Sequence, residues 1–203
     1  MKKYVLMFLC ISAIHIGSPQ AQAQKQPLAT VVTEEDRAST DTQLLIIRHA
    51  LAPGMGDPAH FNINDCSTQR NLSQEGLNQA KNFGNQLKEL GFRPEKVWSS
   101  QWCRAFDTAK ALDLGPVTLL PALNSYFQNR SVAGQQIADL KQFILNLPPK
   151  GGRYVMVTHH VVIGDLTGRW VGSGDGVWLI LTGNQANPWR IEPISSEKPA
   201  LAK

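Results

Sequence analysis

The chain has 203 residues, a hydrophobic fraction of 42% and a formal net charge of +4, values that suit one globular domain with a sizeable core. Its Lys and Arg residues are scattered, with no run that could follow a nucleic-acid backbone, which argues against a nucleic-acid partner. Beyond the first 23 residues, no segment is long and apolar enough for a stable membrane span.

The N-terminal segment has the layout of a secretory signal peptide. Lys2 and Lys3 precede an apolar stretch over residues 4–16, and small residues lead to a predicted cleavage site after Ala23. An uncleaved membrane anchor is the alternative, but the stretch is shorter than the roughly 20 residues that a span requires. We therefore interpret residues 1–23 as a signal peptide and expect an exported protein, periplasmic or secreted. Cleavage would lower the formal charge from +4 to +2, because both lysines are lost.

The rest of the chain divides into an arm and a folded domain. Residues 24–42 lack sustained periodicity and are interpreted as a linker or N-terminal arm. Over residues 43–203, short apolar runs alternate with helical periodicity, a pattern typical of βαβ units. The prediction is an α/β fold, a three-layer sandwich whose mostly parallel central sheet carries helices on both faces.

The first predicted elements are a buried strand at 43–48, a long loop at 49–72 and a helix at 73–91. Ser73 is a suitable N-cap for this helix, and Gly91 is a suitable end. The helix places Leu77, Ala80, Phe83, Leu87 and Leu90 on one face. The later predicted elements are strands at 96–100, 117–123 and 153–159, helices at 101–112, 134–147 and 161–172, and a terminal hairpin of 176–183 and 188–194 at the sheet's edge.

Two of the three cysteines lie outside the predicted signal peptide, namely Cys66 and Cys103. An even pair in an exported chain favours a disulfide, with two free thiols as the alternative. The chain-entropy estimate gives such a bridge about 3–4 kcal/mol. Two cysteines without nearby ligand partners make a poor zinc site, so no metal site is predicted.

Three predicted strand ends carry unusual side chains. The first strand ends at Arg48 and is followed by His49, Arg104 lies in the first turn of the helix after the second, and the last parallel strand ends at His159 and is followed by His160. Carboxyl ends of parallel strands face the same side of a sheet. Arginine forks and a helix N-terminus bind phosphate oxygens, and imidazole can act as a nucleophile. The pattern therefore predicts an anion site that contains a candidate nucleophile.

Four short motifs occur in order over about residues 43–183. They are Arg48-His49, the "RNLSQEGLNQA" helix start, the Ser-Ser-x-x-x-Arg-Ala-x-x-Thr-Ala element at 99–109, and Val157-Thr158-His159. In these motifs the chain resembles the histidine phosphatase superfamily, also called the phosphoglycerate-mutase-like superfamily.

The resemblance implies a mechanism and a class of substrate. His49 would attack phosphorus and become phosphohistidine, while Arg48, Arg104 and His159 would bind the phosphoryl oxygens. Arginines would do the electrostatic work, so no metal and no cofactor are expected. The implied activity is metal-independent hydrolysis of phosphomonoesters in the envelope or periplasm. The substrate could be a phosphorylated small molecule, a sugar or lipid-linked phosphate, or a phosphoprotein.

The general acid is where the chain departs from the family pattern. Branches related to the mutases use a glutamate in a Leu-x-Glu setting after the third strand, where this chain has Asn124 and Ser125. His160 is a candidate acid or base, because the phytase-like branch places its acid there. Further candidates on the long loop are Asp57, His60 and Asp65.

The same comparison suggests a role for the cysteines. Cys103 directly precedes Arg104, so a bridge to Cys66 would hold the long loop beside the pocket. Arg70 and Asn71 would then line its entrance.

Two other functions stay open. The missing glutamate would suit a module that binds phosphoryl ligands without turnover, although binding alone does not require His49. A phosphomutase is less favoured, because mutases protect their phosphoenzyme from water and normally keep the glutamate. Structural roles are also open, since Arg104 could pair with a carboxylate such as Asp107, and His159 could be a core histidine.

Overall fold

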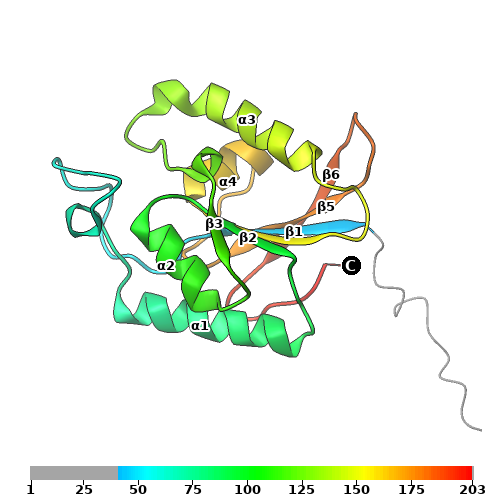
Figure 1. Ribbon diagram of the computed structural model, residues 1–203, viewed down its shortest axis with the longest axis horizontal. Coiled ribbons are helices and arrows are strands. Elements are labelled where there is room, and N and C mark those ends of the chain that lie inside the picture. The colour runs from blue at the N-terminus through cyan, green and yellow to red at the C-terminus, as the bar shows by residue number, and fades with distance from the viewer. Residues whose placement is uncertain (1–40, 203) are drawn as a thin grey trace, which may run out of the picture. The chain divides into compact units, whose positions relative to one another are not determined.

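The computed structural model describes residues 41–202, and every structural statement below concerns that part of the chain. The predicted signal peptide and all but the last two residues of the predicted arm lie outside it. Six strands form one sheet in the order β3-β2-β4-β1-β5-β6 (Figure 1). The strands are β1 (Thr42–Arg48), β2 (Lys96–Ser99), β3 (Val117–Leu119), β4 (Arg153–Thr158), β5 (Gly176–Leu181) and β6 (Trp189–Ile194).

The sheet is mostly parallel, which confirms the predicted fold class. β3, β2, β4 and β1 pair in parallel, and β5 and β6 continue the sheet as an antiparallel hairpin with β6 at the edge. The helices are α1 (Gln74–Glu89), α2 (Cys103–Leu112), α3 (Ala133–Leu145) and α4 (His160–Thr167).

Alternating side chains of the central strands build a core on each face of the sheet. Leu45 and Ile47 of β1 belong to the core beneath α1 and α2, while Leu44 and Ile46 belong to the core beneath α3 and α4. The four residues are at most 1% exposed. A strand buried on both faces reads as a continuous apolar run, as this one does. Figure 1 shows the two helix pairs on opposite sides of the sheet.

The ends of α1 follow from local sequence. Ser73 is the N-cap, and its hydroxyl accepts the Gly76 N–H at 3.1 Å. Gly91, just past the helix, has a φ of 78°, a left-handed conformation that suits glycine. Leu90 was predicted on the buried face but is 44% exposed, because it follows the last helical turn.

Two other predicted elements are shorter than expected. The strand predicted at 117–123 ends at Leu119, and the 3-10 helix Pro121–Leu123 follows it, since proline lacks the N–H that a strand ladder requires. The helix predicted at 161–172 ends at Thr167, because Gly168 turns left-handed with a φ of 71°. Across residues 41–202, no helix combines the length and apolarity needed to span a bilayer.

Candidate active site

The carboxyl ends of β1, β2 and β4 lie at one edge of the sheet. Arg48 of β1 is in register with Thr158 of β4, and the His49 N–H donates to the Thr158 carbonyl at 2.9 Å. Directly after β2, the Ser100 N–H donates to the Val157 carbonyl at 2.9 Å. The sheet register therefore brings the three predicted strand ends together.

His49 is buried with one ring nitrogen facing the pocket. Its Nδ1 lies 2.8 Å from the carbonyl oxygen of Ala50, and the Arg104 Nε donates to its Nε2 at 3.3 Å. A carbonyl only accepts, so Nδ1 carries the proton and Nε2 keeps its lone pair. Burial, followed by the positive charge of Arg104, holds the pKa of His49 well below its ordinary value. A neutral imidazole with an open Nε2 can attack phosphorus.

Arg104 lies in the first turn of α2 and pairs with a carboxylate from the long loop. Its Nη1 is 2.7 Å from Asp57 Oδ1 and its Nη2 is 3.2 Å from Asp57 Oδ2, and both side chains are 3% exposed. The alternative partner Asp107 contacts Lys110 at 3.3 Å instead. Arg104 thus approaches His49 from a fixed position.

Arg48 and Arg70 add two further guanidinium groups. Arg48 donates from Nη1 to the Val171 carbonyl at 3.2 Å, and its buried Nε has no hydrogen-bond partner among the described residues. Arg70 donates from Nε to the Gly56 carbonyl at 2.9 Å. Burial, followed by the charge of Arg104, lowers the pKa of both arginines. An anion placed between these cations would relieve their repulsion and satisfy the open donor.

His159 lies beside His49 at the N-cap of α4. Its ring centroid is 5.4 Å from that of His49, and its Nε2 is 2.9 Å from the Ser100 hydroxyl. The residue is 2% exposed. Burial, followed by its interaction with His49, holds the pKa of His159 well below its ordinary value. The structure therefore places His159 beside His49 at the carboxyl edge of the sheet.

His160 lies at the pocket wall, half-buried between two aromatic rings. Its ring centroid is 5.7 Å from that of Phe127 and 6.0 Å from that of Trp170. Burial lowers the pKa of His160, and the charge of Arg48 lowers it further. At neutral pH this imidazole is uncharged, so it is poorly suited to donate a proton.

The side chains enclose a pocket of about 230 Å³. Asp57 is the single carboxylate among the described residues that line it. Within residues 41–202, no group of three or more His, Cys, Asp or Glu side chains is arranged to hold a metal ion. The lining residues are Arg48, His49, Gly54, Met55, Gly56, Asp57, Arg70, Arg104, Ser125, Phe127, His159 and His160.

The other acid candidates lie away from this pocket. His60 is exposed, and Asp65 is an exposed N-cap that accepts the Ser67 N–H at 2.9 Å. Ser125 lines the pocket, whereas Asn124 faces Ser100 and accepts the Gln101 N–H at 2.9 Å. Of the two residues in the region expected to hold the family glutamate, Ser125 is therefore the one that lines the pocket.

The structure contains the Cys66–Cys103 disulfide. It ties the long loop to the first residue of α2, directly before Arg104. Arg70 lines the pocket, as expected, but Asn71 does not, because its side chain donates to the Cys66 carbonyl at 2.7 Å.

Some supporting residues were not assigned these roles from sequence. Thr108 accepts the Ala50 N–H at 2.9 Å and donates to the Arg104 carbonyl at 2.7 Å, so it links the chain beside His49 to α2. Gln79 of α1 accepts the Leu51 N–H at 3.0 Å. Both residues belong to the quoted motifs. A polar residue within a motif, on a helix that packs against the sheet, was the sequence feature that could have indicated these roles.

The chain belongs to the histidine phosphatase superfamily. The family model described as "Histidine phosphatase superfamily (branch 1)" matches residues 44–142, and the sheet topology and the site agree with that match. No curated protein matches the sequence. Together the family match and the fold support a phosphatase- or mutase-type activity.

Solved structures with the same fold include enzymes of both kinds. The protein histidine phosphatase SixA complexed with tungstate is 19% identical, covering 76% of this chain and 97% of its own, with a TM-score of 0.57. Phosphoglycerate mutase from Plasmodium falciparum is 16% identical, covering 80% and 95%, with a TM-score of 0.53. Phosphoserine phosphatase from Entamoeba histolytica, in complex with 3-phosphoglyceric acid, is 16% identical, covering 76% and 97%, with a TM-score of 0.53.

Proposed function

We propose that this protein is a metal-independent phosphomonoester hydrolase that acts through a phosphohistidine at His49. One observation carries the proposal. The unprotonated Nε2 of His49 lies 3.3 Å from the Arg104 Nε, in a pocket that Arg48 and Arg70 also line. A nucleophile and cationic donors placed together are what phosphoryl transfer requires.

The reaction proceeds in two displacements. In the first, His49 Nε2 forms a bond to phosphorus while the bond from phosphorus to the leaving oxygen breaks. Arg48, Arg104 and His159 bind the phosphoryl oxygens and stabilise the charge that spreads over them. In the second, water attacks phosphorus, the P–N bond breaks, and inorganic phosphate leaves with His49 restored to its neutral form.

The pocket offers little help to a leaving group that needs a proton. Asp57 is ion-paired with Arg104, and the lowered pKa of His160 leaves its ring uncharged. An alkyl alkoxide is a strong base and leaves slowly without an acid, whereas an aryl oxide or a protonated phosphohistidine imidazole leaves more readily. Suitable substrates are therefore phosphomonoesters with a weakly basic leaving group, among phosphorylated small molecules, sugars, lipids or proteins, and the same chemistry would cleave the P–N bond of phosphohistidine on a protein.

This argument predicts a substrate preference. kcat/KM for an aryl phosphate should exceed that for an alkyl phosphate of similar size by at least about 10²-fold, the usual contribution of general acid catalysis. The two rates can be measured by phosphate release under matched conditions. Equal values would mean that a proton donor acts on the alkyl substrate.

Export is part of the proposal. The pattern of the first 23 residues supports it, and so does the disulfide, since disulfides persist in oxidising compartments such as the periplasm. The proposed setting is the periplasm or cell envelope. Fractionation of cells that express the whole chain would test it, and an uncleaved cytoplasmic protein would contradict it.

The activity is tested by aryl-phosphate hydrolysis in the presence of a chelator. We expect wild-type turnover, its loss in His49→Ala, and normal turnover in His60→Ala, a matched control on the exposed part of the loop. Phosphate binding without turnover would favour the ligand-binding module. Transfer of phosphate between two positions of one sugar phosphate, without release, would favour a mutase.

A further inference from the structure

The carboxylate of Asp57 is saturated with hydrogen-bond donors. Besides the two contacts to Arg104, at 2.7 and 3.2 Å, it accepts the Arg70 backbone N–H at 3.1 Å and the Trp102 Nε1–H at 3.0 Å. The side chain is 3% exposed, so these four donors replace water entirely. The loop therefore holds this buried carboxylate in one defined position.

These contacts exclude Asp57 as the proton donor of the reaction. Burial acts to raise the pKa of Asp57, but the hydrogen bonds from Arg104, Arg70 and Trp102 outweigh it and hold the pKa below its ordinary value. The group is therefore ionised at neutral pH and has no proton to give. Its contribution must come from what it holds in place.

A guanidinium group has two edges that can bind an oxyanion in a bidentate way. Asp57 takes the edge formed by Nη1 and Nη2 of Arg104, and Nη1 also donates to the Arg70 carbonyl at 3.3 Å. The remaining edge, formed by Nε and Nη2, faces the nucleophile, since Nε donates to His49 Nε2 at 3.3 Å. That edge carries the Nε–H, which donates to His49 Nε2 here, and one Nη2–H, and both can turn to the oxygens of a phosphoryl group bound at His49.

We propose that Asp57 is a positioning residue that holds Arg104 so that its Nε and Nη2 donors face the oxygens of the phosphoryl group attacked by His49. The inference rests on the proposed function of His49. Positioning matters because preorganised donors stabilise the transition state only in the correct place, and a shift of about 1 Å can cost about 10²-fold in rate.

A blocking role for Asp57 is the competing explanation. Asp57 would then occupy the phosphate-binding edge of Arg104 and leave when substrate arrives. Displacement would break four hydrogen bonds to a buried carboxylate, which is costly unless each donor gains a new partner. Trp102 Nε1 and the Arg70 backbone N–H face Asp57, so leaving would orphan them.

The test compares Asp57→Asn with Asp107→Asn. The asparagine amide would place a donor against the donors that Asp57 now satisfies, so Arg104 should turn. Asp107 lies on α2, the helix that carries Arg104, and its replacement by asparagine removes the same charge. It contacts Lys110 rather than Arg104. Trp102→Phe is a milder second variant that removes one donor from Asp57 and keeps a ring to stack on Phe61.

Three readouts are needed: kcat for an aryl phosphate, competitive inhibition by inorganic phosphate, and the NMR signal of the Arg104 side-chain Nε–H. We expect Asp57→Asn to lower kcat by about 10²-fold while phosphate binds as tightly or more tightly, because an anion has left an anion site. The Nε–H proton should exchange with solvent faster, because it loses its hydrogen bond to His49. Trp102→Phe should lower kcat several-fold, and Asp107→Asn should match wild type.

The opposite results would overturn the inference. A raised kcat in Asp57→Asn would show that Asp57 blocks Arg104, and an unchanged kcat would show that Asp57 does not position it. Parallel losses of kcat and phosphate affinity in the milder Trp102→Phe variant would show a general structural role. If wild type itself lacks turnover, the proposed hydrolase fails, and the Nε–H signal together with phosphate binding still decides whether Asp57 orients Arg104.

Discussion

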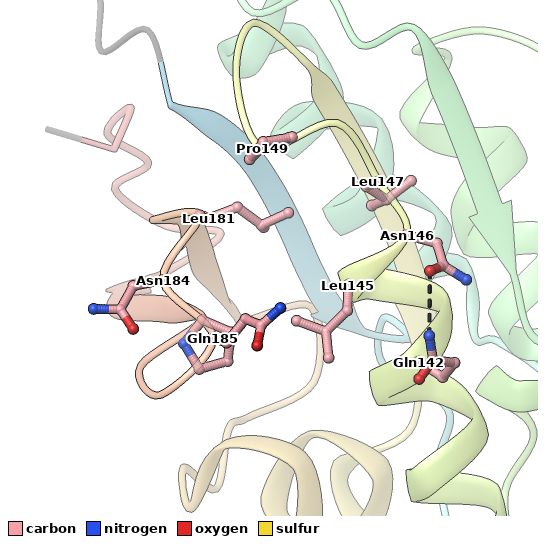
Figure 2. A pocket seen from close by; sticks show the side chains of 10 residues that line it. Gln142, Leu145, Asn146, Leu147, Pro149, Leu181, Asn184 and Gln185 are labelled. Carbon is pink, nitrogen blue, oxygen red and sulfur yellow. Dashed lines mark hydrogen bonds between the residues drawn. The ribbon is translucent and has the colours of Figure 1, made fainter.

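The two edges of the central sheet carry pockets of opposite character. The carboxyl edge holds the pocket of about 230 Å³ with its arginines and histidines, whereas the amino edge holds a larger one of about 510 Å³. Figure 2 shows the larger pocket between the C-terminal end of α3 and the β5–β6 turn, near Pro149 and Leu181. Its side chains are amides, leucines and prolines, with no charged residue among those that line it. Chemistry therefore follows the topology of the sheet rather than the size of the cavity.

The comparison explains why the proposed active site lies at one edge. Parallel strands deliver the residues at their carboxyl ends to a common edge, and here those residues are Arg48, His49 and His159. At the amino edge, the residues at the strand starts make backbone hydrogen bonds to the neighbouring loop. Thr42, for example, donates its backbone N–H to the Pro149 carbonyl at 3.0 Å. Substitutions at the two edges should therefore differ sharply in effect.

The largest effect is expected from Arg104→Lys at the reactive edge. Lysine keeps the charge but has no fork, so it cannot contact Asp57 and the phosphoryl group together. We expect kcat to fall by about 10²- to 10³-fold in steady-state hydrolysis, as for loss of a transition-state donor. Thermal unfolding would verify that the variant is folded. A fall of less than about threefold would remove Arg104 from the transition state and weaken the contrast between the edges.

Loss of the disulfide should destabilise the same edge. Cys66→Ser combined with Cys103→Ser frees a loop closed across a sequence separation of 37. The free energy of unfolding should fall by about 3–4 kcal/mol, measured by chemical denaturation. Activity should fall as well, because the loop carries Asp57 and Arg70. Full activity in the double variant would show that the bridge serves stability alone.

The buried histidines predict how stability depends on pH. Because the pKa of His49 and of His159 lies well below the ordinary value of 6.5, the unfolded chain takes up protons at a pH where the folded chain does not. Stability is therefore complete above about pH 6.5 and falls as the pH drops, by about 1.4 kcal/mol per pH unit for each histidine. His49→Asn should reduce that slope by about 1.4 kcal/mol per pH unit, the contribution of one histidine. An unchanged slope would mean that His49 titrates normally.

The smallest effect is expected at the amino edge. Asn146→Ala removes an exposed side chain that accepts from Gln142 Nε2 at 3.2 Å. Stability should change by no more than about 0.5 kcal/mol, and aryl-phosphate kcat/KM should stay at the wild-type value. A large loss of activity would link the larger pocket to catalysis and break the contrast on which the site assignment depends.

The sequence predicted the sheet and the strand-end residues because both leave periodic or local signals. The apolar run 44–47 marks a strand buried on both faces, Arg48 ends that strand, and His49 and His159 directly follow strands. The ion pair of Arg104 with Asp57 left no such signal. It depends on the conformation of the loop over 49–72, where the contacts to Arg70 and Trp102 span long sequence separations. Asp57 was therefore considered as an acid, a role that its four donors contradict.

Secondary-structure ends were missed for a similar reason. The apolar sequence 117–123 suits a strand, but β3 has a single neighbour, β2, and ends after three residues. Gly168 could have been predicted to end α4, since a glycine after a helical stretch often adopts the left-handed conformation. Local features such as these set where a strand or helix ends, but they do not change where the site residues lie.

Trapping the phosphoenzyme tests the central claim most directly. Wild type would be mixed with a ³²P-labelled aryl phosphate, quenched within milliseconds in denaturant, and mapped for covalent label. We predict one labelled residue, His49, with the alkali stability and acid lability of a phosphoramidate, and no label in His49→Ala. Rapid hydrolysis by wild type with label on another residue, or with none at any quench time, would contradict the phosphohistidine mechanism.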